Sequence, residues 1–424
     1  MKKEEHASLG ETLFTDTLPN GLRVLVARKP GFRRSFAMFA TDYGGAMRRF
    51  RVDGQWLDTP AGVAHYLEHK MFDMPDGSHI LSAFSARGAS PNAYTSSGMT
   101  AYHFSCTDGF EENLRLLLRF VSTPYYTPES VEKERGIIAQ EILAMENDPD
   151  TVSYYQLMEA LYAHHPIRDG VGGTVESISK ITPETLYRCH GAFYRPSNMT
   201  LCCVGDVEPE QVADIARELT APEMAPAPEV DYGEPESPAP AESFRERRMA
   251  VAKPLFALGA KLAVPAEGKE QLRRQLIAEL GLECLCGESS AFYTELYGKG
   301  LLNRSFGTDV EFSAGTGTLL LSGESPDPQA VAEALQGALD RVARRGLDRN
   351  AFELCRRARY GQELSALDQF RRYASALAKG SFRGWSPLEV FPLLTELTAE
   401  DAAGFLCESL SPSRLALTVV KPEE

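Results

Sequence analysis

Residues 182–204 read TPETLYRCHGAFYRPSNMTLCCV, and residues 398–420 read TAEDAAGFLCESLSPSRLALTVV. Each copy has a threonine suited to cap a helix, a Pro-Ser turn after the helical stretch, and an apolar run typical of a buried strand. The copies align without a gap at an offset of 216 residues, from position 182 to position 398. Convergence on a common helix–turn–strand phrase is the alternative, but the constant offset favours duplication. We therefore expect two similarly folded halves.

A segment rich in proline, alanine and glutamate separates the two copies. Residues 221–243 read APEMAPAPEVDYGEPESPAPAES, and their few large apolar residues are isolated from one another. Such a composition cannot bury enough apolar surface to fold alone. We therefore predict an extended, exposed linker over 221–243, between a first domain of residues 1–220 and a second domain of residues 244–424.

The apolar pattern predicts a mixture of strands and helices. Strand-like runs occur at residues 21–29, 35–43 and 100–107. Helical stretches are expected over residues 62–73, 109–123, 128–147 and 151–164. Because these elements interleave without a strict βαβ rhythm, the pattern favours an α+β fold. We expect two homologous tandem domains, each a mostly antiparallel sheet with helices packed on one face.

Charge and composition exclude several classes of partner. The net charge of −15 argues against nucleic acid or an anionic membrane as the main partner, because both would repel the chain. No stretch approaches the roughly 20 apolar residues that span a bilayer. No apolar run of about 7–15 residues follows the N-terminal lysines, as a secretory signal would require. The eight cysteines form no CxxC pair, and Cys284 and Cys286 are spaced too tightly for the usual zinc site. We expect reduced thiols and a cytoplasmic protein.

Residues 65–69, HYLEH, carry the chemistry of a metal site. On a helix, positions i, i+3 and i+4 share a face, so His65, Glu68 and His69 would point into one small volume. Two imidazoles at this spacing suit zinc, and a carboxylate beside them can accept a proton from water. An exposed helix face that bears these residues by chance is the alternative. The apolar residues around the motif weaken it, because a polar triplet in an apolar helix needs partners.

A catalytic zinc needs a third protein ligand and an open position. The helix that is expected to begin near Pro128 carries Glu134 and Glu141, which are two turns apart and therefore share a face. One carboxylate could bind the metal while the other supports a ligand. Taken alone, a glutamate pair on a helix is more often a solvated face. Its proximity to the histidines is a prediction that only the fold can test.

Five ordered blocks of the N-terminal half resemble the pitrilysin/insulinase family of inverted zinc peptidases, in its bacterial processing-peptidase-like branch. They are LPNGLRVLV (18–26), TPAGVAHYLEHKMF (59–72), GASPNAYTSSGMTAYHFS (88–105), EKERGIIAQEI (132–142) and FYRPSNMTLCCVGDV (193–207). The resemblance implies a zinc endopeptidase with one Zn²⁺ per chain. It assigns His65, His69 and Glu141 as ligands, Glu68 as general base and Glu134 as a supporting carboxylate of the catalytic site.

The same resemblance implies that a peptide substrate binds as an added strand beside the NAYT block. The residues that match this block and its surroundings are Ser90, Asn92, Ala93, Tyr94 and Thr95. Backbone hydrogen bonds at an open sheet edge suit this role, because they hold any extended peptide. From the residues alone, Asn92 is equally well explained as a turn residue after Pro91.

The second half departs from the family pattern. Family members carry an arginine and a tyrosine seven residues apart beside a Lys/Arg-Gly-Leu phrase, and these hold the substrate. The phrase here is Lys299-Gly300-Leu301, which places the two positions at Leu296 and Asn303. Nearby side chains of the right type are out of register: Tyr293, Tyr297 and Arg304. At 216 residues from the zinc motif lie Gly281, Cys284 and Leu285, so no second zinc site is expected.

The missing pair bears on the expected assembly. The resemblance implies dimers that enclose a chamber, and we expect a heterodimer with a related chain that lacks the zinc motif and supplies the arginine and tyrosine. A homodimer is the alternative.

Two other functions remain open. One is a non-catalytic processing or assembly factor that keeps zinc for stability, because the chain also resembles a bacterial subfamily associated with 5-aminopentanol modification of elongation factor P. The other is simple metal storage, which Glu68 argues against because storage needs no base.

Overall fold

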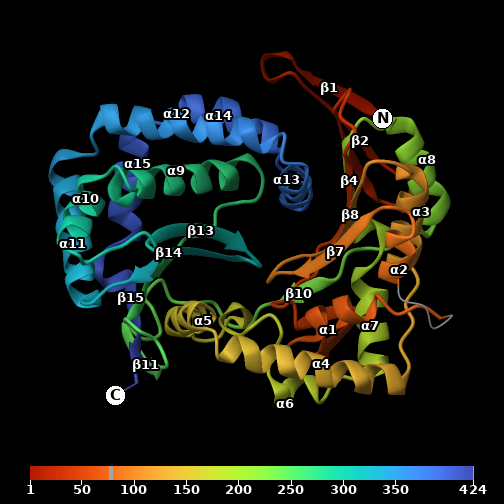
Figure 1. Cartoon of the computed structure of the whole chain (residues 1–424), viewed down its shortest axis with the longest axis horizontal. Coiled ribbons are helices and arrows are strands. Elements are labelled where there is room, and N and C mark those ends of the chain that lie inside the picture. The colour runs from red at the N-terminus through yellow and green to blue at the C-terminus, as the bar shows by residue number, and fades with distance from the viewer. Residues whose placement is uncertain (76–79, 424) are drawn as a thin grey trace. The chain divides into compact units, whose positions relative to one another are not determined.

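The computed structural model describes residues 1–75 and 80–423, and the chain forms two compact units (Figure 1). Unit 1 contains Met1–Ile142, Gly170–Tyr232 and Leu364–Leu388, and unit 2 contains the rest. The division at Tyr232 falls inside the predicted linker. Two segments nevertheless differ from the predicted consecutive domains, because residues 143–169 belong to unit 2 and residues 364–388 belong to unit 1.

Unit 1 is built on a seven-stranded sheet in the order β1-β2-β3-β9-β4-β8-β7. All neighbouring strands are antiparallel except β3 and β9. The strands are β1 (Lys2–His6), β2 (Glu11–Thr17), β3 (Arg23–Arg28), β4 (Ser35–Thr41), β7 (Ser90–Thr95), β8 (Thr100–Cys106) and β9 (Met199–Gly205). The three strand-like runs of the sequence thus correspond to β3, β4 and β8, and β7 lies at one edge of the sheet.

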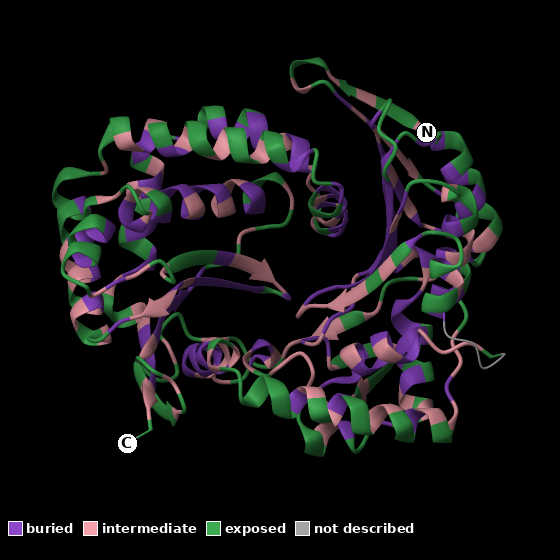
Figure 2. Ribbon diagram, viewed as in Figure 1, coloured by how far each residue is buried: buried purple, intermediate pink, exposed green. Residues whose placement is uncertain are grey.

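The helices of unit 1 are α1 (Val63–Lys70), α2 (Ile80–Ser85), α3 (Phe110–Val121), α4 (Pro128–Glu146, which ends in unit 2), α6 (Val175–Ile178), α7 (Pro183–Phe193), α8 (Pro209–Leu219) and α13 (Phe370–Arg383), with 3₁₀ turns η1 (Ala7–Leu9) and η3 (Pro196–Asn198). Helix α3 packs on β4 and β8, α8 packs on β3, and α1 packs on β7 and β8. Every residue of β4 and β9 is buried, in keeping with their continuous apolar sequences. Buried positions run along these strands in Figure 2.

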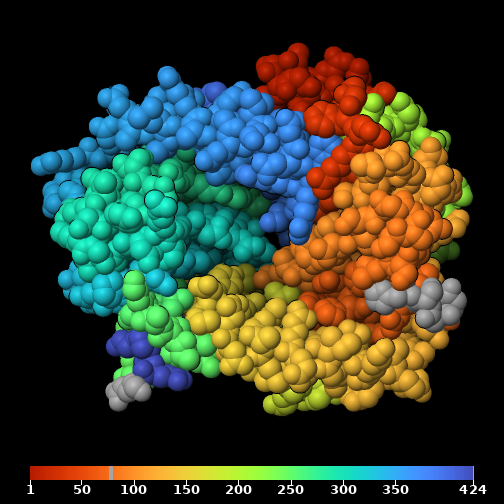
Figure 3. All heavy atoms as spheres, in the orientation of Figure 1, coloured from red at the N-terminus to blue at the C-terminus, as the bar shows by residue number. Residues whose placement is uncertain are grey.

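Helix α13 comes from the second half of the sequence and packs on β9 and β4. In Figure 3, blue atoms of this late part of the sequence lie against red and orange atoms of the early part. The guanidinium of Arg23 donates to the carbonyl of Ser381 at 2.5 Å and lies over the ring of Phe382. Met38 and Cys202 are partners across β4 and β9 and are fully buried. Both lie outside the main core of unit 1, which contains their neighbours Ala37 and Cys203. The centre of this sheet therefore carries helices on both faces, whereas the sequence predicted helices on one.

The predicted linker is partly ordered. Strand β10 (Glu229–Asp231) pairs with β5 (Arg49–Val52), which pairs with β6 (Gln55–Asp58) in a small three-stranded sheet. Val230 and Tyr232, two of the isolated apolar residues of the segment, pack against the core of unit 1. Most of residues 221–243 are exposed, as predicted, and the segment also contributes the short strand β10, which the sequence did not indicate.

Unit 2 contains a five-stranded sheet in the order β11-β15-β12-β14-β13, in which only β11 and β15 are parallel. Helix α5 packs on β12 and β15. The elements are α5 (Pro149–Leu161), η2 (Pro166–Arg168), β11 (Phe244–Met249), β12 (Leu255–Lys261), α9 (Lys269–Cys286), α10 (Ala291–Gly298), β13 (Gly307–Ser313), β14 (Thr316–Glu324), α11 (Pro328–Arg345), α12 (Arg349–Ala366), η4 (Pro387–Glu389), α14 (Val390–Glu396), α15 (Ala399–Ser409), η5 (Pro412–Arg414) and β15 (Leu415–Pro422).

The repeated phrase forms the same local structure in both units. Thr182 caps α7 by accepting from the backbone N–H of Thr185, with φ −122° and ψ 161°. Thr398 caps α15 by accepting from the N–H of Asp401, with φ −119° and ψ 159°. In each case a 3₁₀ turn and then an interior strand of the sheet follow, β9 in unit 1 and β15 in unit 2. The α+β class with two homologous domains is confirmed. None of the helices in residues 1–75 and 80–423 combines the length and apolar character of a bilayer span.

Candidate active site

The HYLEH motif lies on α1, whose start is fixed by a glycine. Gly62 has φ 92°, and a Cβ at this position would lie 2.4 Å from the carbonyl oxygen of Gly172. On the following turns His65 and His69 share one face, with ring centroids 4.6 Å apart. The helix is otherwise largely buried in unit 1. Its polar triplet is therefore held in an apolar setting, as the motif predicts.

Two bonds dock α1 on α4. The hydroxyl of Tyr66 donates to the carbonyl of Val131, and the ammonium of the buried Lys70 donates to the carbonyl of Ser130 at 3.2 Å. Lys70 also pairs with Asp73. These contacts set the register of the two helices and bring the glutamates of α4 beside the histidines. Sequence reasoning did not single out either residue, although both lie inside or next to the motif.

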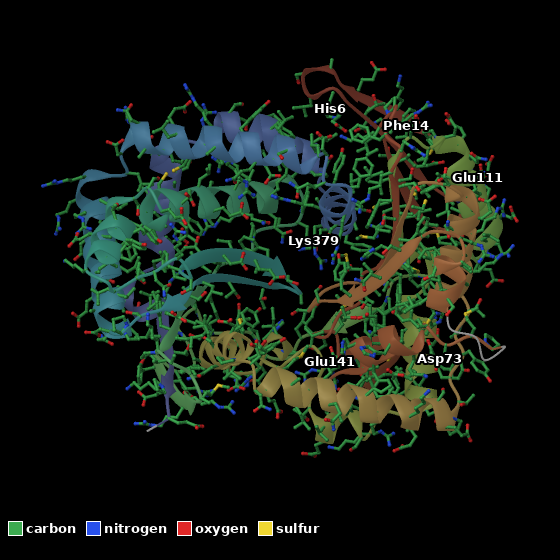
Figure 4. All side chains as sticks on the ribbon, viewed as in Figure 1. His6, Phe14, Asp73, Glu111, Glu141 and Lys379 are labelled. Atoms are coloured by element: carbon green, nitrogen blue, oxygen red, sulfur yellow. The ribbon has the colours of Figure 1, made fainter. Side chains whose placement is uncertain are left out.

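The structure brings the two histidines together with Glu141. The Nε2 atoms of His65 and His69 lie 3.7 and 3.4 Å from the carboxylate oxygens of Glu141, which Figure 4 labels on α4. One ligand atom from each residue lies within 4.8 Å of the other two. Three donors that face one another at this distance can bind a metal ion. Among the described residues, no other group of three histidines, cysteines or acidic residues meets the same criterion.

Glu134 holds the other side of His69. Its carboxylate lies 3.0 Å from Nδ1 of His69, so Nε2 is left to face Glu141. A carboxylate on the second ring nitrogen orients a ligating histidine and raises its basicity. The two glutamates, which the spacing alone could not tell apart, thus lie in different positions relative to the histidines.

The histidines differ in their electrostatic surroundings. Burial, together with the neighbouring His69, lowers the pKa of His65 to about 4, so its imidazole is neutral and free to bind a metal at neutral pH. Nδ1 of His65 is buried and has no hydrogen-bond partner in the described part of the chain. Burial also acts to lower the pKa of His69, but the hydrogen bond to Glu134 and the nearby carboxylates outweigh it and raise that pKa.

Glu68 lies on the same helix as a buried carboxyl group. Burial raises its pKa above the ordinary value, and the hydrogen bond from Thr95 and the charge of His69 oppose that rise. The Oγ1 atom of Thr95 donates to Oε2 of Glu68 at 2.7 Å. A carboxylate with a raised pKa beside a metal-binding group is suited to accept and return protons.

The five residues predicted to contact substrate all lie on β7. This strand pairs with β8 from Ser90 opposite Ser105 to Thr95 opposite Thr100, and in the described chain no strand pairs with its other edge. Pro91 has no N–H and is tolerated at such an edge. Asn92 is exposed and lies within the strand, so its alternative interpretation as a turn residue is wrong.

The side chains of β7 alternate between two faces. Ser90 is exposed and Ala93 is partly buried. The hydroxyl of Tyr94 forms a 3.0 Å hydrogen bond with Oγ of Ser375 on α13. Thr95 points the opposite way, to Glu68 on α1. Tyr94 and Thr95 therefore have partners within unit 1, and sequence reasoning missed both because each partner comes from a distant part of the chain.

The second-half positions that correspond to the family's arginine and tyrosine have other roles. Leu296 is buried in unit 2. The amide of Asn303 donates to the carboxylate of Glu324 at 2.7 Å. Tyr293 donates to the carbonyl of Asn303, and its ring stacks on that of the exposed Tyr297. The side chains at positions 296 and 303 thus take part in the internal packing of this unit.

Comparison with known proteins places the chain in a family. Models described as "Insulinase (Peptidase family M16)" and "Peptidase M16 inactive domain" match residues 54–175 and 180–359. A Bacillus subtilis protein named as an uncharacterized zinc protease, YmfH, is 38% identical over 428 residues and covers 100% of both chains. A Mycobacterium leprae protein with a similar name, ML0855, is 29% identical over 51% of this chain and 48% of its own.

Solved structures agree with this placement. The crystal structure of an M16-like peptidase from Alicyclobacillus acidocaldarius has 36% sequence identity and a TM-score of 0.93, covering 97% of this chain and 99% of its own. A protease from Helicobacter pylori, at 19% identity and a TM-score of 0.84 over 97% and 99% of the two chains, shares the fold. With full-length similarity to YmfH and a pair of M16 domains in the expected order, this chain belongs to peptidase family M16, the insulinase family.

Proposed function

We propose that the protein is a zinc-dependent endopeptidase that hydrolyses extended peptides or small unfolded polypeptides, with Glu68 as general base. The observation that carries the proposal is the position of Glu68. It shares a helix face with His65 and His69 and is hydrogen-bonded to the last residue of the open edge strand β7.

Zinc fits the donor set. Two imidazole nitrogens and one carboxylate oxygen are the ligands of many catalytic zinc sites, which keep the fourth position open. The neutral imidazole of His65, whose Nε2 lies 3.7 Å from the carboxylate of Glu141, can offer a lone pair to a metal. When bound, zinc would acidify water and polarise the scissile carbonyl.

The residues of the chain have distinct tasks in this mechanism. The edge of β7 binds the peptide backbone as an added strand, with Ser90, Asn92 and Ala93 at its accessible end. Glu68 accepts a proton from the attacking water and delivers it to the leaving amine. Glu134 keeps His69 in the tautomer that presents Nε2 toward Glu141.

The test is cleavage of a peptide library by the purified chain. Activity should be lost with a chelator and restored by added Zn²⁺. Glu68→Gln should lower turnover by about 10³-fold or more while zinc content stays near one per chain. Glu146→Gln, a change of an exposed glutamate at the end of α4, is the matched control and should keep full activity. Full peptidase activity in Glu68→Gln would refute the assignment of the base.

We further propose that the active form is a heterodimer with a related chain that lacks the zinc motif. The proposal is supported by Leu296 and Asn303, which stand where family members carry the arginine and tyrosine. Size-exclusion chromatography of the chain with and without its candidate partner, combined with activity measurements, tests it. High activity from a monomer would exclude partner dependence, and high activity from a dimer of identical chains would favour the homodimer.

The same two positions favour a second candidate function, a processing or assembly factor that retains zinc for stability. In that case zinc removal should lower the free energy of unfolding without any peptidase activity to lose. Cleavage of the library that depends on both zinc and Glu68 would exclude this candidate.

A further inference from the structure

We infer that Thr95 is a positioning residue that holds the carboxylate of Glu68 in the orientation needed for proton transfer. The inference rests on the proposed function and extends it, because the family resemblance placed Thr95 among the substrate contacts. Oγ1 of Thr95 donates to Oε2 of Glu68 at 2.7 Å. In the described chain, this is the one hydrogen bond made by the Glu68 side chain.

The hydroxyl of Thr95 has a fixed location. Thr95 is the last residue of β7 and lies opposite Thr100 of β8, with 3.3 Å between their Oγ1 atoms. The side chain of Thr100 is fully buried and donates to the carbonyl of Tyr43 at 2.8 Å. Threonine is also stiff at χ1, because its Cβ is branched. The donor is thus held by the sheet, and the long side chain of Glu68 adapts to it.

Holding the carboxylate has a direct effect on catalysis. A glutamate side chain has three rotatable bonds, and only a fraction of its rotamers brings an oxygen to the reacting water. A hydrogen bond to a charged group selects one of these rotamers. Loss of this bond should therefore lower kcat and leave the binding of the peptide backbone unchanged.

The position of Thr95 also joins two functions in one strand. Tyr94 faces α13 and Thr95 faces α1, as alternation along β7 requires. A peptide added along the free edge of β7 lies beside the strand that ends at the donor to Glu68. Substrate alignment and base orientation consequently depend on the same strand.

The experiment compares three variants of the full chain. Thr95→Val keeps the branched shape and removes the hydroxyl, Thr95→Ser keeps the hydroxyl, and Thr17→Val makes the same exchange at an exposed strand position of unit 1. For each, kcat and KM are measured with one peptide substrate, together with zinc content and melting temperature. Crystal structures of zinc-loaded Thr95→Val and of the unmodified protein give the position of the Glu68 carboxylate.

Thr95→Val should lower kcat by about 10- to 100-fold with KM within about 2-fold, and Thr95→Ser should recover most of kcat. In the Thr95→Val crystal structure the carboxylate should leave its place. A raised KM with unchanged kcat would overturn the inference and indicate that Thr95 contacts the substrate. A Glu68 carboxylate that keeps its position in Thr95→Val would also overturn it, because Thr95 would then not hold Glu68. If the unmodified protein cleaves no peptide, the proposed endopeptidase function fails, and the crystal structures still decide whether Thr95 holds Glu68.

Discussion

Glu134 and Glu141 of α4 have different proposed roles beside the histidines, the first as a supporting carboxylate and the second as a metal ligand. Glu134 contacts Nδ1 of His69 and Glu141 faces Nε2 of both histidines. We predict that Glu134→Gln weakens zinc binding by about 10- to 100-fold, because a neutral amide orients the imidazole less firmly. Glu141→Gln should weaken binding further, since it alters a ligand. Competition with a chromophoric chelator measures both, and equal losses in the two variants would contradict the assigned roles.

The candidate site could be predicted from the spacing of the motif, because a helix places positions i, i+3 and i+4 on one face. That argument predicts the grouping of His65, Glu68 and His69. It does not choose between Glu134 and Glu141, because residues two turns apart share a face and the choice depends on how α4 lies against α1. The hydrogen bond from Thr95 to Glu68 likewise could not be predicted from the sequence. It joins residues 27 positions apart, and it depends on how the sheet and the helix pack together.

In unit 2, Glu236 of the predicted linker is a partly buried carboxylate with a structural role. Burial alone would raise its pKa, but hydrogen bonds from the backbone N–H groups of residues 163–165 and from Lys261 lower the pKa to about 2. We predict that Glu236→Gln lowers the free energy of unfolding by about 2 kcal/mol at pH 7, because three N–H donors then face a neutral amide.

The pH dependence of this effect has a definite sign. A depressed folded-state pKa gives a stabilisation that is complete above the ordinary value of 4.5 and is lost as the pH falls toward 2. The difference between Glu236→Gln and the unmodified chain should therefore shrink below about pH 4. Urea unfolding at pH 7 and pH 3 measures it, with the exposed Glu234→Gln as control. A constant difference at both pH values would contradict the prediction.

At the scale of the element, α1 depends on the glycine at its start. Gly62 has φ 92° and no room for a Cβ beside the carbonyl of Gly172. We predict that Gly62→Ala lowers the free energy of unfolding by about 2–4 kcal/mol and also weakens zinc binding, because the helix that carries both histidines must shift.

A second glycine provides the contrast. Gly136 lies on the exposed side of α4, and a Cβ there would meet nothing within 4 Å. Gly136→Ala should stabilise the protein by about 0.5–1 kcal/mol, since alanine favours the helix. Thermal unfolding followed by circular dichroism measures both variants. If both alanines changed the melting temperature in the same direction, backbone conformation at Gly62 would not be the cause.

At the scale of the whole chain, the duplication could be predicted from the sequence. The exchange of segments, in which residues 143–169 join unit 2 and residues 364–388 join unit 1, could not. The Thr-capped helix, Pro-Ser turn and strand recur at positions 182 and 398 because local chemistry determines them. The apolar stripe of α13, by contrast, indicates that this helix is half-buried without indicating which sheet it covers. Its contact with β9 and β4 joins residues more than 160 positions apart, and no local pattern encodes it.

Because residues 364–388 belong to unit 1, the unit that carries the candidate active site is not complete within one consecutive segment. A fragment of residues 1–232 contains the proposed zinc ligands, Glu68 and β7, but lacks α13. Its residues 143–169 also lose their partners in unit 2, as they do in the second fragment described below. The face of the sheet that bears Met38 and Cys202 would then be exposed to water, and such a patch favours a loosely packed state. We predict that this fragment binds a hydrophobic dye and unfolds without a sharp transition.

A second fragment makes the prediction specific. In this fragment a flexible Gly/Ser linker joins residues 1–232 to residues 364–388, so that α13 can return to its sheet while residues 233–363 and those after 388 are left out. This version should bind less dye and unfold more cooperatively than the first, as judged by near-ultraviolet circular dichroism during urea titration. A scrambled 364–388 segment of the same composition controls for added length. If the fragment without α13 unfolds as sharply as the joined version, α13 does not stabilise the sheet, and residues 1–232 fold cooperatively without it.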